Sequence, residues 1–343
     1  MQSCTRWAAL LTAVTFTACS GGMSRPVVPP GPIVPAKQSA SCSFGRFKIF
    51  TGPSGGQGGL GITHDEHGNL WYPSTNLNAI VKMTRTGQTT IYTIPDASAI
   101  PQAIAEDRHH HMWFTEYNLP RIGEVTLSGA FTTYAIKALG TGLSESYGIA
   151  QGSDGRIWFT TGLDGIGARK GSGKTKLYRL KNNNEHPSTI VLGPDKNLWF
   201  TEYNGPHIGK ISTTGHVSEY VNGQGLSSYG IASGPDGRIW FTDPGNHRIG
   251  AIETSGKGLQ YYSVGNNTPY EITSRSKDKN LYFTDAYGFI GQITTQGKVR
   301  VCPIPANPSF SAFGITENTD HNMWFVENSS SLTYSRVGEL ILP

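Results

Sequence analysis

A short aromatic phrase returns seven times along the chain, about every 42 residues, and it limits the possible folds more than any other feature. Its most regular copies read Trp-Phe-Thr followed by Glu, Asp or Thr. Self-similarity at a fixed period in this range indicates a repeat architecture. A side chain present in every copy is then expected to be structural, and one that departs from the pattern is a candidate for function. The copies are Leu70–Ser74, Met112–Glu116, Ile157–Thr161, Leu198–Glu202, Ile239–Asp243, Leu281–Asp285 and Met323–Glu327.

Each repeat reads as four short strands. A Gly-Ile or Ala-Ile step and an Asp-Gly turn precede the aromatic phrase, and an Ile-Gly strand and a Thr-Gly or Ser-Gly turn follow it. Aromatic and β-branched residues favour strands between such turns. Four antiparallel strands repeated radially form the blade of a propeller. We therefore predict an all-β, seven-bladed β-propeller of four-stranded antiparallel blades, forming one domain over residues 44–343.

The two ends of this domain predict how the ring closes. The last repeat stops after its third strand, at Val337–Leu340, while Arg46–Phe50 resembles a fourth strand without a repeat of its own. The N-terminal strand is therefore expected to complete the last blade. Cys42 then lies one blade away from Cys302 in the outer strand of the sixth blade. We expect a disulfide between them in an oxidising compartment, with two free thiols as the alternative.

The N-terminal residues indicate export. Residues 1–18 contain an apolar stretch that is too short to cross a bilayer and ends in small residues, as in a signal peptide. Cys19 follows two small residues, which resembles the lipobox of bacterial lipoproteins, and a plain secretory signal is the alternative. Residues 19–43 are rich in Pro and Gly and read as an extended tether after a lipidated Cys19. We expect a cell-envelope lipoprotein that faces the periplasm or the exterior, attached to the membrane through its lipid only, or else a secreted protein.

Charge and short motifs exclude several function classes. The net charge of +4 is spread through the repeats without a basic stripe, so nucleic acid is not indicated. Residues 168–175 superficially match a phosphate-binding loop, but they align with the turn between the third and fourth strands of the other repeats. Nucleophile motifs of hydrolases are absent from the sequence. The protein is expected to be a monomer.

The strongest functional signal is predicted at the mouth of the central channel, where the second strands end and the first strands begin. Carboxylates and aromatic side chains gathered there would bind a cation or a hydroxylated ligand. As the alternative, these carboxylates recur for a structural reason, because each forms hydrogen bonds with the backbone of a neighbouring blade. The candidate metal ligands are Glu116, Glu202, Asp243, Asp285 and Glu327. The candidate ligand-binding residues are Gln102, Tyr147, Tyr229, Tyr270 and Phe313.

Histidines gather in turns on the opposite face. They belong to the turns between first and second strands in blades one, two and seven, at His64–His67, His109–His111 and Asp320–His321. Imidazole and carboxylate groups brought together there could hold a transition metal. Ordinary solvated turns are the alternative, since other repeats place Asp, Gly and Lys at these positions.

The repeated Trp-Phe-Thr-Glu phrase, with its upstream Gly-Ile and downstream Ile-Gly, resembles the virginiamycin B lyase family of seven-bladed propellers over residues 44–343. The resemblance implies a magnesium-dependent elimination in which a His base opens the cyclic ester of streptogramin B antibiotics. Position by position, Glu327 matches a metal-binding Glu, Phe313 stands at the base His, Ser311 at its neighbouring Glu and Tyr270 at a second His. Phenylalanine cannot accept a proton, so general-base catalysis at that position is excluded.

These observations lead to one expectation and two alternatives. We expect a propeller that binds a small molecule or a cell-envelope component at its acidic mouth, with Mg²⁺ as its possible cofactor and without streptogramin lyase activity. The first alternative is a divalent-cation-dependent carbon–oxygen lyase with a different acid–base group. The second is a protein-interaction scaffold that uses blade faces and loops.

Overall fold

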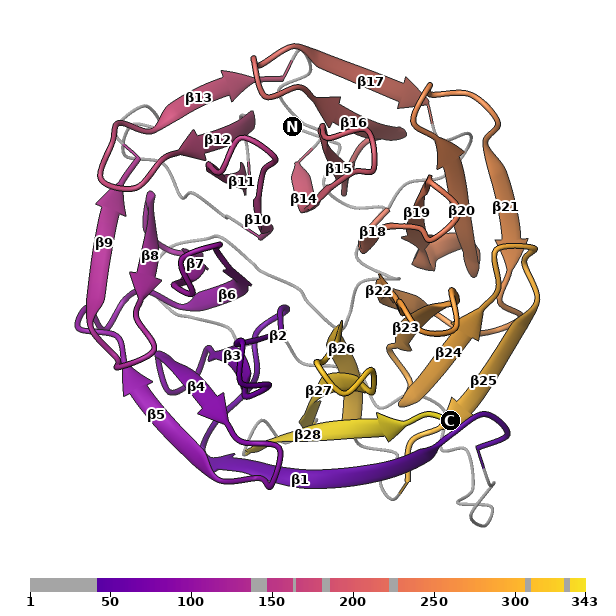
Figure 1. Cartoon of the computed structure of the whole chain (residues 1–343), viewed down its shortest axis with the longest axis horizontal. Helices are drawn as coiled ribbons and strands as arrows, with labels where there is room; N and C mark the ends of the chain where they lie inside the picture. Colours follow the sequence, from indigo (N-terminus) through magenta and orange to yellow (C-terminus); the bar gives the residue numbers. More distant parts are fainter. Residues whose placement is uncertain are drawn as a thin grey trace, which may run out of the picture.

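The computed structural model describes residues 42–136, 147–162, 165–180, 186–221, 228–305, 310–329 and 334–343. In this part of the chain, seven four-stranded antiparallel sheets stand around a central channel (Figure 1). Within each sheet the first strand of the repeat faces the channel and the fourth lies at the outer edge. The seven-bladed propeller predicted from the repeats is thereby confirmed.

The first four blades follow the chain in order. Blade 1 contains β2 (Thr63–His64), β3 (Leu70–Ser74), β4 (Ala79–Met83) and β5 (Thr89–Thr93). Blade 2 contains β6 (Pro101–Glu106), β7 (Met112–Glu116), β8 (Arg121–Val125) and β9 (Phe131–Ala135). Blade 3 contains β10 (Ile149–Gln151), β11 (Ile157–Thr161), β12 (Gly165–Arg169) and β13 (Lys176–Arg179). Blade 4 contains β14 (Pro187–Leu192), β15 (Leu198–Glu202), β16 (His207–Ile211) and β17 (Val217–Val221).

The remaining three blades close the ring. Blade 5 contains β18 (Ile231–Ser233), β19 (Arg238–Asp243), β20 (Arg248–Glu253) and β21 (Gln260–Ser263), with the short 3₁₀ helix η2 (Pro244–Asn246) after β19. Blade 6 contains β22 (Pro269–Ser274), β23 (Leu281–Asp285), β24 (Phe289–Ile293) and β25 (Val299–Pro303). Blade 7 contains β26 (Phe310–Glu317), β27 (Met323–Ser329), β28 (Tyr334–Ile341) and the N-terminal β1 (Arg46–Ser54).

The Trp and Phe of the repeated phrase fill the blade interiors. In blade 5, Trp240 stacks on Tyr262 of the fourth strand, with ring centroids 5.3 Å apart, and its indole N–H donates to Asp236 at 3.0 Å. Phe241 lies flat over Gly250 of the third strand, where an added Cβ would come within 2.2 Å of the ring. The downstream Ile-Gly step therefore recurs because any larger residue would displace the Phe ring.

The Thr of the phrase joins neighbouring blades. Thr201 Oγ1 donates to the carbonyl oxygen of Tyr229 in the next blade at 2.6 Å, and Thr242 Oγ1 donates to that of Tyr270 at the same distance. The inner strands approach so closely that a Cβ at Gly230 would lie 2.6 Å from the Tyr270 carbonyl oxygen. The upstream Gly-Ile step is thus explained by the narrow space between first strands.

The ring closes by pairing the two ends of the domain. β1 runs antiparallel to β28, from Arg46 opposite Ile341 to Ser54 opposite Tyr334. A disulfide joins Cys42 to Cys302 in β25, so that the outer edges of blades 6 and 7 are covalently linked. The predicted completion of the last blade by the N-terminal strand is confirmed. The positions of the signal peptide, the tether up to residue 41 and Cys19 lie outside the described residues.

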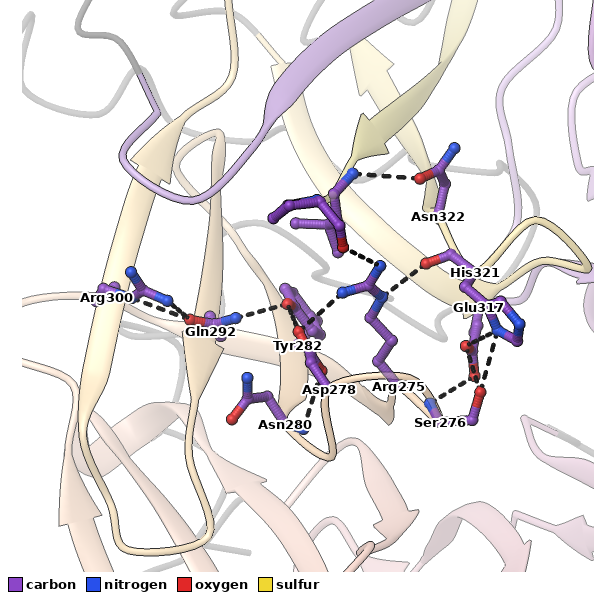
Figure 2. A network of polar contacts seen from close by, with 12 residues as sticks. Arg275, Ser276, Asp278, Asn280, Tyr282, Gln292, Arg300, Glu317, His321 and Asn322 are labelled. Carbon is purple, nitrogen blue, oxygen red and sulfur yellow. Dashed lines mark hydrogen bonds and ion pairs between the residues drawn. The ribbon is translucent and has the colours of Figure 1, made fainter.

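A buried arginine fixes the C-terminal residues to blade 6 (Figure 2). The Arg275 side chain is 2% exposed and donates to the carbonyl oxygens of His321 at 2.7 Å and Pro343 at 3.2 Å. It also pairs with Asp278 at 2.9 Å. The side chain thus satisfies one backbone carbonyl in the turn between β26 and β27 and one after the last strand. Within the described residues, no helix combines the length and apolar character needed to cross a membrane.

Candidate functional site at the channel

The candidate metal ligands lie at or near the ends of second strands, and each is buried inside its own blade. Four of them face a basic side chain at or near the start of the third strand of the same blade. The buried carboxylates therefore have a local structural partner. The pairs are Glu116 with Arg121, Glu202 with His207 at 3.5 Å, Asp243 with Arg248 at 2.7 Å and Glu327 with Arg336 at 2.9 Å.

Asp285 is the exception, because its blade opens the third strand with Phe289 instead of a basic residue. Its carboxylate accepts the backbone N–H groups of Tyr287, at 2.8 Å, and of Thr268. Burial raises the pKa of Asp285 to about 6, although these hydrogen bonds and the charge of His247 oppose the rise.

This arrangement does not fit a shared Mg²⁺ site. None of the five carboxylates lines the channel cavity. A magnesium ion prefers six oxygen ligands in octahedral geometry, whereas these carboxylates point into separate blades. Among the described residues, no group of three or more His, Cys, Asp or Glu side chains could hold a metal ion. The same result applies to the histidine-rich turns, where Asp65 is buried and accepts the indole N–H of Trp71 at 3.0 Å.

A Ser, a His and a Glu also meet between blades 6 and 7 (Figure 2). Ser276 Oγ lies 3.1 Å from Nδ1 of His321, and Glu317 Oε1 lies 2.8 Å from the same nitrogen. A catalytic triad needs the acid and the nucleophile on opposite ring nitrogens. In this cluster Ser276 and Glu317 both contact Nδ1 of His321, so the three residues are hydrogen-bonded but do not have the arrangement of a hydrolase triad.

Three of the four candidate ligand-binding aromatic residues, Tyr229, Tyr270 and Phe313, come together at the mouth. Ring centroids are 6.4 Å apart for Tyr203 and Tyr229, 4.3 Å for Tyr229 and Tyr270, and 5.2 Å for Tyr270 and Phe313. We call these four residues the aromatic rim. On another part of the mouth, Tyr147 lies 5.6 Å from Tyr117. The sequence had not assigned a role to Tyr117 or Tyr203, although both directly follow the Glu of the repeated phrase.

Gln102 occupies the corresponding position in blade 2 and is 8% exposed. Its carbonyl oxygen accepts the backbone N–H of Leu60 at 2.8 Å and that of Gly61 at 3.2 Å. The backbone of Gln102 therefore joins blade 2 to blade 1. It is not one of the residues that line the channel cavity.

The rim tyrosines are unsuited to accept a proton. Burial raises the pKa of Tyr270 to about 12, and it raises the pKa of Tyr229 well above its ordinary value. Burial also raises the pKa of Tyr203. These hydroxyl groups stay neutral at physiological pH, which leaves them as hydrogen-bond donors and apolar contact surfaces.

Beneath the rim, the first strands of all seven blades line a cavity of about 490 Å³, and the four rim residues are not among those that line it. Tyr147, Thr189, Glu271 and Gly314 line it near the mouth, and Glu106 lines it at the other end of the channel. A cavity of this volume is within the range of small-molecule sites in proteins.

Glu271 is the functional candidate that the sequence analysis missed. It directly follows the aromatic residue of the first strand, where the other six repeats have Gly, Ala or Thr. Its carboxylate accepts a hydrogen bond from Thr189 Oγ1 at 3.2 Å, reaching from blade 6 to blade 4. Burial raises the pKa of Glu271 to about 8. The signal was available, because a residue that breaks a repeat is a candidate for function.

Together, the fold and this site define a seven-bladed propeller with an aromatic mouth above a narrow central cavity. The sequence model of the virginiamycin B lyase family matches residues 41–142 and 137–339. The chain belongs to the virginiamycin B lyase family.

Solved structures place the chain among the same relatives. Virginiamycin B lyase from Staphylococcus aureus is 29% identical with a TM-score of 0.77, and the match covers 87% of this chain and 100% of that one. A streptogramin B lyase is also 29% identical, with a TM-score of 0.78 and coverage of 88% and 100%. A catalytically inactive His-to-Ala variant of the S. aureus enzyme, solved with quinupristin, is 28% identical, with a TM-score of 0.77 and coverage of 87% and 100%. No curated protein matches the chain.

A more distant likeness shows the fold alone. The extracellular domain of a hybrid two-component system from B. thetaiotaomicron is 16% identical, with a TM-score of 0.67, and the match covers 87% of this chain and 43% of that one.

Proposed function

We propose that the protein is an exported, lipid-anchored propeller. It binds a small molecule at its channel mouth and does not cleave a bond of that molecule. The observation that carries this proposal is the aromatic rim, in which side chains from successive blades make one continuous contact surface. Aromatic walls with a few polar groups are typical of small-molecule sites. The ligand is a free small molecule or a component of the cell envelope.

Three observations support binding over lyase chemistry. Phe313 stands where the family resemblance implies a base, and its ring has no proton acceptor. The rim tyrosines have raised pKa values, so they do not replace that base. Mg²⁺ has no part in this proposal, because four of the five candidate carboxylates pair with a basic residue of their own blade and Asp285 accepts backbone N–H groups.

The test uses quinupristin, the compound solved with the staphylococcal relative. Binding to the purified protein is measured by isothermal titration calorimetry, and ring opening by liquid chromatography with mass spectrometry. We expect quinupristin to bind, to remain cyclic, and to bind at least tenfold more weakly to Phe313→Ala. The control is Ile91→Ala, an exposed residue of the outer strand β5. Ring opening by the unmodified protein would refute the binding-only function, and equal affinity of Phe313→Ala would refute the rim as the site.

The lipid anchor has a separate test. The expectation is that Cys19 carries the lipid, as its lipobox-like context indicates. The full-length protein produced in bacteria should partition into the detergent phase of Triton X-114, whereas Cys19→Ser should remain in the aqueous phase. Equal partition of the two proteins would exclude the anchor and leave the secreted alternative.

A further inference from the structure

The central cavity contains one acidic group whose role is not explained by the repeat. Glu271 stands on the channel-facing strand β22, and its neighbour in the ring, Gly230 of blade 5, has no side chain. A Cβ added at Gly230 would lie 3.0 Å from Glu271 Oε2. The glycine thus leaves the space that the carboxyl group needs to reach Thr189 of blade 4.

Glu271 is half-buried, and its electrostatic surroundings differ from those of the buried candidate carboxylates. Asp243 and Glu327, for example, face arginines at 2.7 and 2.9 Å. In the described part of the chain, no Lys, Arg or His forms an ion pair with Glu271; its hydrogen-bond partners are the Thr189 hydroxyl group and the backbone N–H of Ile272. A carboxylate held away from bulk water without a cation is costly, and a cationic ligand would compensate it.

The aromatic rings above Glu271 suit the same kind of ligand. Tyr229 and Tyr270 lie close enough for the carboxylate to raise both of their pKa values, with ring centroids 4.3 Å apart. The faces of aromatic rings attract organic cations, and binding sites for quaternary ammonium groups combine such rings with low exposure to water. A carboxylate close to aromatic rings therefore suits an ammonium group.

We propose that Glu271 makes the cavity beneath the aromatic rim a binding site for the ammonium group of a small organic amine. This inference rests on the proposed ligand-binding function and names the chemical class that the channel accepts. A divalent metal ion is disfavoured, because one carboxylate and one hydroxyl group are far fewer than the six or more oxygen ligands that Mg²⁺ or Ca²⁺ requires. The cavity of about 490 Å³ has room for an amine of modest size.

The pH dependence of binding distinguishes an ammonium ligand from a neutral ligand that would accept a hydrogen bond from Glu271. An ammonium ligand needs the ionised carboxylate, whereas a ligand carbonyl group would need the protonated acid as a donor. The groups that face Glu271 are Thr189 from β14, Tyr229 ahead of β18 and Tyr270 on its own strand. The two tyrosines have raised pKa values and stay neutral between pH 6 and 9, so Glu271 is the group that titrates.

The probes are choline and its uncharged isostere 3,3-dimethylbutan-1-ol, titrated into the protein by calorimetry. Choline carries a permanent charge, so its own ionisation does not change with pH. We expect choline to bind at least tenfold more tightly than the alcohol, and its affinity to rise at least tenfold from pH 6 to pH 9. Glu271→Gln should lose both effects, while Glu253→Gln, at an exposed site, should keep them.

Several results would overturn the inference. These are absence of choline binding, equal affinities for choline and the alcohol, an affinity that rises as the pH falls, or unchanged choline binding by Glu271→Gln. If Glu271→Gln does not fold, Glu271→Gly restores the residue that four other repeats carry, and the pH series on the unmodified protein needs no variant. If only the ammonium site at Glu271 is wrong, quinupristin binding that depends on Phe313 should persist. That result distinguishes failure of this inference from failure of the proposed ligand-binding function.

Discussion

Replacing Glu271 by Gln should change how stability depends on pH. Burial raises the pKa of this carboxyl group from 4.5 to about 8. Between these values the folded protein holds a proton that the unfolded chain has released, so the contribution of Glu271 is fully present below pH 4.5 and is lost as the pH rises towards 8. One pKa unit corresponds to about 1.4 kcal/mol. The full rise in pKa would change the free energy of unfolding by roughly 5 kcal/mol. Because solvent in the channel screens the group, we expect a change of about 2 to 3 kcal/mol.

The assay is denaturant unfolding of the unmodified protein and of Glu271→Gln at pH 5, 7 and 9, followed by circular dichroism. Glutamine keeps the shape of the side chain and cannot ionise. The stability of the variant relative to the unmodified protein should therefore rise by about 2 to 3 kcal/mol between pH 5 and 9. A difference that stays constant over this range would show that Glu271 titrates normally, and the burial argument would fail.

Three further changes test the blade framework, each by the free energy of unfolding. Gly250→Ala should cost about 2 to 3 kcal/mol, because the new methyl group would overlap the ring of Phe241; a cost below about 0.5 kcal/mol would contradict the packing. Cys302→Ser should lose about 2 to 4 kcal/mol under oxidising conditions and nothing under reducing ones, and a loss in both would point to packing instead. Asp243→Asn should cost about 2 kcal/mol, because Arg248 loses a partner in a largely buried pair; quinupristin affinity should not change.

The architecture could be predicted from the sequence because the main packing contacts inside a blade recur from repeat to repeat. Trp240 needs a hydrogen-bond acceptor and a stacking partner, and Phe241 needs a glycine opposite. The glycine opposite the aromatic ring recurs at the same spacing in six blades, with Val81 opposite Tyr72 in blade 1, so this contact appears in the sequence as part of one phrase. The orphan strand at Arg46–Phe50 was predictable for the same reason, since the last repeat lacks its fourth strand.

The electrostatics of the site were less predictable. The place of Glu327 in the repeated phrase was clear, but its pairing with Arg336 depends on which side chains face one another across two strands. A carboxylate at a strand end can point into the channel or into the blade, and spacing does not distinguish these directions. Glu271 can be recognised in the sequence by comparison of the repeats, because the other six have Gly, Ala or Thr at its position.

The pairing of β1 with β28 also sets the order in which the molecule can be assembled. Arg46 is synthesised long before its partner Ile341. Until then β1 has no neighbour in its sheet and presents unpaired backbone groups, which exposes it to pairing with other chains. Contacts this distant in sequence form slowly. The seventh blade therefore cannot be completed until β28 has been synthesised, and closure of the ring waits for that strand.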